Sequence, residues 1–73
     1  MNMWTVRYYQ QGVPYEMEGD TKREVLMEAG LLQQAGRLSM YQLISPSGEV
    51  DMDQAQLDDF VNKDEELKHT ILL

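Results

Sequence analysis

The fold is decided by residues 20–36, DTKREVLMEAGLLQQAG, which form the only long helix signal in the chain. Asp20 and Thr21 are both good N-cap residues, and Glu24, three residues after Thr21, predicts a capping box. An apolar stripe recurs at helical spacing through Val25, Ala29, Leu32 and Gly36. Gly36 is expected to end the helix, because a left-handed conformation costs glycine nothing. We therefore expect one amphipathic helix that covers the flanking strands.

Gly30 lies inside this helix, where glycine costs about 1 kcal/mol relative to alanine. Two interpretations follow. Either the glycine is simply tolerated, or another backbone approaches closely beside the apolar stripe.

Upstream of the helix, alternating side chains predict a β-hairpin. Residues 3–10 and 13–18 each alternate, and Gln11-Gly12 between them is a suitable two-residue turn. This turn fixes the facing pairs: Val6 with Met17, Tyr8 with Tyr15 and, on the other side, Arg7 with Glu16. The valine and the two tyrosines are expected to lie beneath the helix. Pro14 indicates that the second strand lies at an edge of the sheet.

Downstream of the helix, residues 38–45 predict a third strand and residues 49–52 a fourth, joined by the turn Ser45-Pro46-Ser47-Gly48. The expected register places Ile44 opposite Val50 and Gln42 opposite Met52. The inner face then carries Leu38, Met40, Ile44, Val50 and Met52, with Gln42 as a misfit, and the outer face carries Tyr41 and Leu43.

A second helix is expected to start at Asp53, which is a good N-cap. Its apolar side consists of Leu57, Phe60 and Val61. The helix is expected to break near Asn62-Lys63, because Asp64 would otherwise fall on that apolar side. Residues 63–73 predict a charged helical turn and then the apolar end Ile71-Leu72-Leu73, which packs on the domain itself or on a partner.

These elements predict a single small α+β domain over residues 1–73. The order ββαββα is typical of a two-layer sandwich, with a four-stranded antiparallel sheet and the helices on one face. A chain of this length supplies only a thin core.

The charge is concentrated at one end of the chain. Thirteen acidic and six basic residues give a net charge of −7, and residues 49–66 hold eight of the acids but only one base. Such a segment attracts a basic partner surface. Direct nucleic-acid binding is not expected, because no basic patch is present. No run is long enough for a membrane span, the start of the chain lacks a signal peptide, and cysteine is absent, so we expect a cytoplasmic protein.

Catalytic chemistry finds little support in the sequence. His69 is the only histidine, and no cysteine or suitably placed serine accompanies it. Asp58 and Asp59 are adjacent on a helix and therefore point about 100° apart. We expect no catalytic residues, no cofactor and no enzymatic activity.

A metal site is not expected either. Asp51-Met52-Asp53 starts like a calcium loop, but Ala55, Gln56 and Asn62 stand where such a loop needs an oxygen ligand, a glycine and a glutamate. The five glycines show no phosphate-binding spacing.

Three surfaces are candidates for binding a partner. The first is the pair Met27 and Leu31, one turn apart on the main helix and away from its apolar stripe. The second is the outer sheet face, with Tyr9, Tyr41 and Leu43. The third is an acidic ridge led by Asp51, Asp53, Asp58 and Asp59 and continued by Asp64, Glu65 and Glu66. The structural alternatives are cover by the second helix or the tail, aromatics scattered without a role, and acids that serve solubility.

The segments Trp4-Thr5-Val6-Arg7-Tyr8-Tyr9 and Gly12-Val13-Pro14-Tyr15 resemble the start of GYF-type peptide-binding modules. The aromatic positions that such modules carry later in the chain are absent. We therefore assign the chain to no family.

Together these features predict a non-enzymatic module that binds another protein with a basic surface and regulates or inhibits it. One alternative is a structural or self-associating accessory protein that forms a homodimer. Another is a nucleic-acid-mimicking inhibitor of a DNA- or RNA-binding protein.

Overall fold

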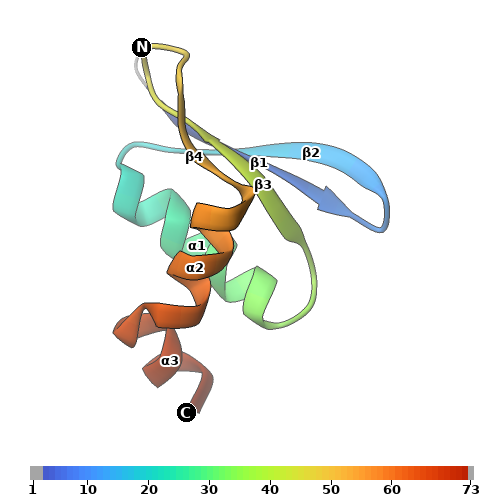
Figure 1. The fold of residues 1–73 in the computed structure, drawn as a ribbon, viewed down its shortest axis with the longest axis vertical. Coiled ribbons are helices and arrows are strands. Elements are labelled where there is room, and N and C mark those ends of the chain that lie inside the picture. The colour runs from blue at the N-terminus through green and yellow to red at the C-terminus, as the bar shows by residue number, and fades with distance from the viewer. Residues whose placement is uncertain (1–2, 73) are drawn as a thin grey trace.

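The computed structural model describes residues 3–72 and shows an antiparallel sheet backed by helices (Figure 1). The elements in chain order are β1 (Trp4–Gln10), β2 (Val13–Gly19), α1 (Lys22–Gln34), β3 (Ser39–Ile44), β4 (Val50–Asp53), α2 (Gln54–Lys63) and α3 (Glu65–Leu72). The predicted ββαββα order is confirmed, and a third helix follows it. The docking expected for the apolar end Ile71-Leu72-Leu73 concerns side chains outside the described residues.

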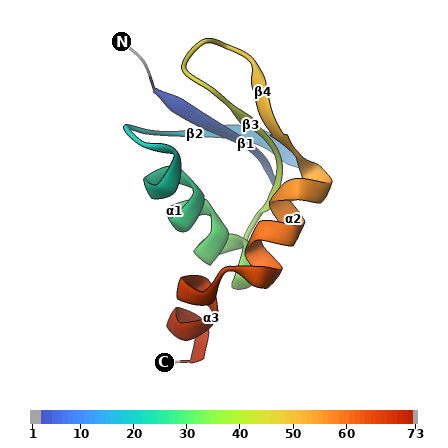
Figure 2. The same ribbon diagram turned by 60° about the vertical axis from the view of Figure 1, so that its left-hand side comes forward.

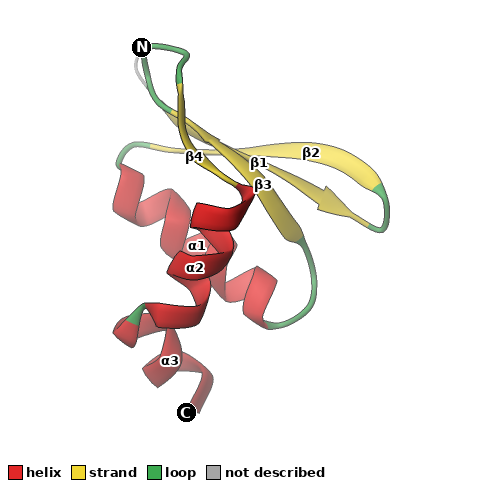
Figure 3. Ribbon diagram, viewed as in Figure 1, coloured by secondary structure: helices red, strands yellow, loops and turns green. Residues whose placement is uncertain are grey.

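The four strands form one sheet in the order β2-β1-β3-β4, and all neighbouring pairs are antiparallel. The helices gather on one face of this sheet, and no element of residues 3–72 covers the opposite face, which we call the bare sheet face (Figures 2 and 3). The predicted fold class, a two-layer α+β sandwich, is therefore confirmed. No helix within residues 3–72 combines the length and the apolar character needed to cross a membrane.

The first hairpin has the predicted turn and register. Gln11 and Gly12 both have positive φ, 52° and 78°, which is typical of a type I′ turn. The observed pairs are Val6 with Met17, Arg7 with Glu16 and Tyr8 with Tyr15. Strand β2 lies at the edge of the sheet, as Pro14 predicted.

Tyr15 does not lie beneath the helix, so this part of the prediction is wrong. Tyr8 is half-buried and packs against the core, whereas Tyr15 is 46% exposed and Val13 is 47% exposed. Tyr15 is exposed because the β1–β2 turn projects beyond the end of the helical layer (Figure 1). The Tyr15 ring stacks on the Tyr8 ring instead, with centroids 5.8 Å apart.

A bulge in β3 changes which side chains face the helices. Arg7 pairs with Gln42 but Tyr8 pairs with Met40, so Tyr41 is left without a partner on β1. The bulge reverses the alternation beyond it. Leu43 therefore points into the core and is 0% exposed. The prediction that Leu43 lies on the outer face is wrong.

The register between β3 and β4 is only partly as predicted. Ile44 pairs with Val50, which confirms that pair. Met52 pairs with Leu43 instead of Gln42, because the register between β3 and β4 shifts between Leu43 and Ile44. Val50, expected on the inner face, is 53% exposed.

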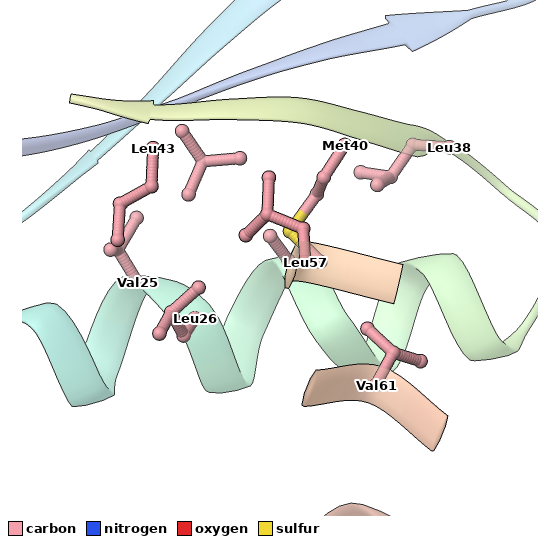
Figure 4. Packing of buried hydrophobic residues seen from close by; sticks show 9 residues of the cluster. Val25, Leu26, Leu38, Met40, Leu43, Leu57 and Val61 are labelled. Atoms are coloured by element: carbon pink, nitrogen blue, oxygen red, sulfur yellow. The ribbon is translucent and has the colours of Figure 1, made fainter. Parts of the chain in front are cut away.

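The core lies between β3 and the two helices α1 and α2 (Figure 4). Side chains from β1, from β3 and the residue before it, and from both helices are almost completely buried there: Val6, Val25, Leu26, Ala29, Leu38, Met40, Leu43, Leu57 and Val61. Each of these residues removes apolar surface from water, which is the main force that stabilises so small a domain.

The helix boundaries follow from local capping. The Thr21 side chain accepts a hydrogen bond from the backbone N–H of Glu24 at 3.1 Å, and Gly36 has the left-handed φ of 76° expected of the residue that ends α1. Asp53 caps α2 as predicted, and it forms a complete capping box with Gln56.

Helix α3 packs against α1 at Gly30. A Cβ at this position would lie 2.9 Å from Leu67 Cδ1, and Leu67 is fully buried. The close neighbour is thus a side chain of α3 and not another backbone. The absence of a side chain at Gly30 lets α3 pack against α1.

We predict that Gly30→Leu releases α3, because the new side chain occupies the volume that holds Leu67. The backbone amides of residues 67–69, which are hydrogen-bonded in the first turn of α3, should exchange with solvent faster by a factor of about ten or more, since burial of a leucine is worth about 1.5–3 kcal/mol. Hydrogen exchange followed by NMR measures this directly.

Gly30→Ala is the matched control. It adds one methyl group against the flexible end of Leu67 and gains about 1 kcal/mol of helix propensity. If amide exchange in α3 is the same in Gly30→Leu as in the wild type, the proposed packing of α3 at Gly30 is wrong.

Candidate binding surfaces

The bare sheet face carries a stacked pair of tyrosines. The Tyr9 and Tyr41 rings lie 4.6 Å apart between centroids at an interplanar angle of 26°, and Tyr9 is 45% exposed. Tyr9 points outward from β1, and Tyr41 is the bulged residue of β3. Of the three residues on this face that were nominated for partner binding, Tyr9 and Tyr41 are thus brought together, whereas Leu43 lies in the core.

Arg7 connects three strands on the same face. Its Nε donates to Glu16 Oε2 on β2 at 3.0 Å, and its Nη1 donates to Gln42 Oε1 on β3 at 3.3 Å. The Arg7 and Glu16 side chains are both substantially exposed, so this ion pair contributes at most about 1 kcal/mol. Its main effect is to order the polar side chains beside the tyrosines.

Two apolar residues that were predicted for the inner face, Ile44 and Val50, lie on the outer face. Ile44 pairs with Thr5 and Val50, and these residues share the side opposite to Val6. Val50 is the most exposed of the large apolar residues described. The polar Gln42 on the predicted inner face could have indicated this outcome. A bulge that turns Gln42 outward also turns Ile44 outward, because the two residues lie on the same side of the strand.

Met27 and Leu31 are half-buried, and therefore do not form the exposed pair that was expected. Helix α3 packs against the same helix at Gly30. A contact between this pair and a partner stays a prediction.

The nominated aspartates remain exposed, but each has an internal partner. Lys22 donates to Asp51 at 2.6 Å, and Asp53 caps α2. Asp59 forms an ion pair with Lys63 one helical turn away. These residues therefore stabilise the fold while they keep this end of the protein negatively charged.

Asp58 takes part in a junction between three elements. Gln33, near the end of α1, donates to Asp58 Oδ1 on α2 at 3.0 Å and accepts from the backbone N–H of Met40 on β3 at 2.8 Å. This arrangement holds both helices against the sheet.

Asp64, expected at the end of the acidic ridge, is instead mostly buried, with its side chain 12% exposed. Arg23 donates to both of its oxygens, at 2.7 Å and 3.3 Å, and the backbone N–H of Leu67 donates to Oδ1 at 3.2 Å. The carboxylate thus joins α1 to α2 and also caps α3. The hydrogen bonds from Arg23 hold the pKa of the Asp64 carboxyl below its usual value, and the same contact raises the pKa of Arg23.

A groove of about 400 Å³ lies beside Asp64 and Arg23, and no pattern in the sequence indicates it. It is lined by Lys22, Arg23, Leu26, Met52 and Phe60, which come from α1, β4 and α2. Lys22 lies over the Trp4 ring and Arg23 over the Phe60 ring, at 5.7 Å and 5.9 Å from the centroids. Both cations also form ion pairs with aspartates of the same chain. The groove therefore combines an apolar floor with two cations, each of which is already paired with an aspartate.

Within residues 3–69, where side chains are described, no three His, Cys, Asp or Glu residues are close enough to hold a metal ion. His69 is exposed on α3. No family model, curated protein or solved structure matches this chain. The function must therefore be inferred from the surfaces described above.

We predict that Asp64→Asn changes the acid dependence of stability. Because the pKa of Asp64 is lowered in the folded state, its contribution is complete above the unfolded value of about 3.9 and is lost as the pH falls through the folded-state value. The wild type should therefore lose stability below about pH 4 more steeply than the variant. Urea unfolding at a series of pH values measures the difference.

Asparagine retains one oxygen that can cap α3, and it removes the titrating group together with one acceptor of Arg23. The absolute stability of the variant can therefore change, but the acid-dependent part of the comparison reports on the Asp64 carboxyl. The exposed carboxylates contribute equally to both proteins. Parallel curves of unfolding free energy against pH would contradict the assigned role.

Proposed function

We propose that this protein is a non-enzymatic module that binds another protein through the bare sheet face and thereby regulates or inhibits it. The observation that supports this best is the stack of exposed Tyr9 on half-buried Tyr41. Tyrosine provides a large amphipathic contact area at a low cost in side-chain entropy, and it is enriched where proteins meet.

The surroundings of the stack favour a protein partner. Exposed Val50 and half-buried Ile44 extend the apolar area across β3 and β4. Arg7, Glu16 and Gln42 supply polar groups at its side. A central aromatic anchor with a polar rim is the usual composition of a protein interface.

The acidic third of the chain defines the kind of partner. Residues 49–66 hold eight acids, and the internal ion pairs do not remove their excess over the bases. This charge steers a basic surface toward the protein and raises the association rate at low salt. With no cysteine in the sequence, a reducing compartment suits the protein, and we propose the cytoplasm.

The test replaces Tyr41 by a photo-crosslinking amino acid in the full chain. We expect a cross-linked partner from this position and none from the same group at Glu28, an exposed residue of α1 in the helical layer. Yield should fall as the salt concentration rises, because the steering charge is screened.

The double variant Tyr9→Ser/Tyr41→Ser then quantifies the interface with the captured partner. We expect affinity to fall by a factor of about ten or more, since central tyrosines often contribute above 1 kcal/mol each. Thermal unfolding of the variant checks that the fold persists. Equal cross-linking from Glu28, or equal affinity of the double variant, would contradict the proposal.

A further inference from the structure

Strand β2 is a long and regular free edge of the sheet. All seven of its residues pair with β1 without a register shift, and no described strand lies on its other side. The opposite edge, β4, has four residues and an irregular register with β3. An unpaired edge of this kind is a template for another extended chain.

The hairpin geometry fixes which backbone groups face the open side. The pair that flanks a two-residue turn, Gln10 and Val13, exchanges hydrogen bonds, and such pairs alternate along the ladder. Pro14, Glu16 and Glu18 therefore direct their backbone groups away from β1. Proline has no N–H, so the available donors are those of Glu16 and Glu18.

The side chains of β2 form two rows of different chemistry. The helix side carries Val13 and Tyr15, two of the four large apolar residues that are exposed among those the structure describes. The outer side carries the exposed carboxylates of Glu16 and Glu18. Glu16 is bonded to Arg7 through one oxygen only, and Glu18 makes no hydrogen bond or ion pair among the described residues.

This pattern opposes pairing with a second copy of the chain. Two antiparallel β2 strands would bring Glu16 or Glu18 of one copy opposite a glutamate of the other, and like charges directly opposite are destabilising. The net charge of −7 on each copy adds to the repulsion. A strand with basic side chains at alternate positions would instead be attracted to Glu16 and Glu18.

We propose that the β2 edge accepts an extended segment of the partner protein, in which lysine or arginine alternates with apolar residues. The basic side chains lie beside Glu16 and Glu18, and the apolar ones lie beside Val13 and Tyr15. The backbone of the segment pairs with the free groups of Glu16 and Glu18 and adds a fifth strand to the sheet. This inference rests on the proposed function as a protein-binding module and identifies the chemistry of its partner.

The probe is a short acetylated peptide that alternates lysine and valine, added to the isotope-labelled full chain. We expect the backbone amides of Glu16 and Glu18 to shift and to become protected from solvent exchange in NMR spectra. A peptide of the same composition with all lysines at one end has the same charge but cannot place them alternately. It should bind at least about fivefold more weakly.

Three variants separate charge from backbone pairing. Glu18→Gln removes the charge and keeps the donor, and we expect peptide affinity to fall about twofold to fivefold. Glu18→Pro removes the donor as well and should weaken binding about fivefold further, in an orientation that Pro14 shows the hairpin to tolerate. Glu65→Gln, on α3, makes the same change in net charge and should leave affinity unaltered.

Several outcomes would overturn the inference. These are equal binding of the block peptide, binding without protection of the Glu16 and Glu18 amides, and equal effects of Glu18→Gln and Glu65→Gln. Protection of both amides without peptide, together with a dimer in sedimentation, would assign the edge to a second copy. If Glu18→Pro does not fold, the NMR spectra of the wild type with the alternating and the block peptide still test the inference.

The result is separable from the test of the proposed function. The Tyr9→Ser/Tyr41→Ser variant leaves β2 intact and should bind the peptide like the wild type. Peptide binding without cross-linking at Tyr41 would remove the sheet-face interface and retain the edge, and the reverse result would remove the edge alone.

Discussion

Arg7 pairs with Gln42 and Tyr8 pairs with Met40, so Tyr41 between them has no partner on β1. This bulge decides which side chains reach the core, because the alternation of β3 is reversed beyond it. Without the bulge, Gln42 would face the helices and Leu43 would face solvent. Burial of a leucine is worth about 1.5–3 kcal/mol, whereas an unsatisfied buried amide costs about 1–3 kcal/mol. The bulge therefore buries Leu43 and keeps the Gln42 amide out of the core.

The same bulge shapes the exposed surfaces. Tyr41 turns outward beside Tyr9, and Gln42 becomes a partner of Arg7 on the bare face. A chain of 73 residues has enough apolar side chains to cover one face of a four-stranded sheet, so the other face and the β2 edge stay open. The proposed interface and the proposed strand addition both use surface that the helices leave uncovered.

Local patterns predicted what depends on neighbours in sequence. The Gln11-Gly12 turn, the Thr21 and Asp53 caps and the end of α1 at Gly36 all follow from a few adjacent residues. Other features depend on segments far apart in the chain. These are the bulge, the projecting turn that exposes Tyr15, the contact of Asp64 with Arg23, and the packing of α3 at Gly30. The bulge left a trace in the sequence, as a polar Gln42 on a face that was otherwise apolar. Gly30 left another, as a glycine inside the predicted helix, but its neighbour on α3 could not be identified from the sequence. The candidate surfaces were accordingly predicted in part: the tyrosines came together, but Leu43 did not join them.

The most direct test of the bulge compares Leu43→Ala with Ile44→Ala by urea unfolding. The described structure predicts that Leu43→Ala, at a fully buried position, costs about 2–5 kcal/mol and leaves a chain of this size largely unfolded. Ile44→Ala, on the outer face, should cost distinctly less. A regular strand would reverse this order, so a larger loss of stability for Ile44→Ala would contradict the bulge and the surfaces that depend on it.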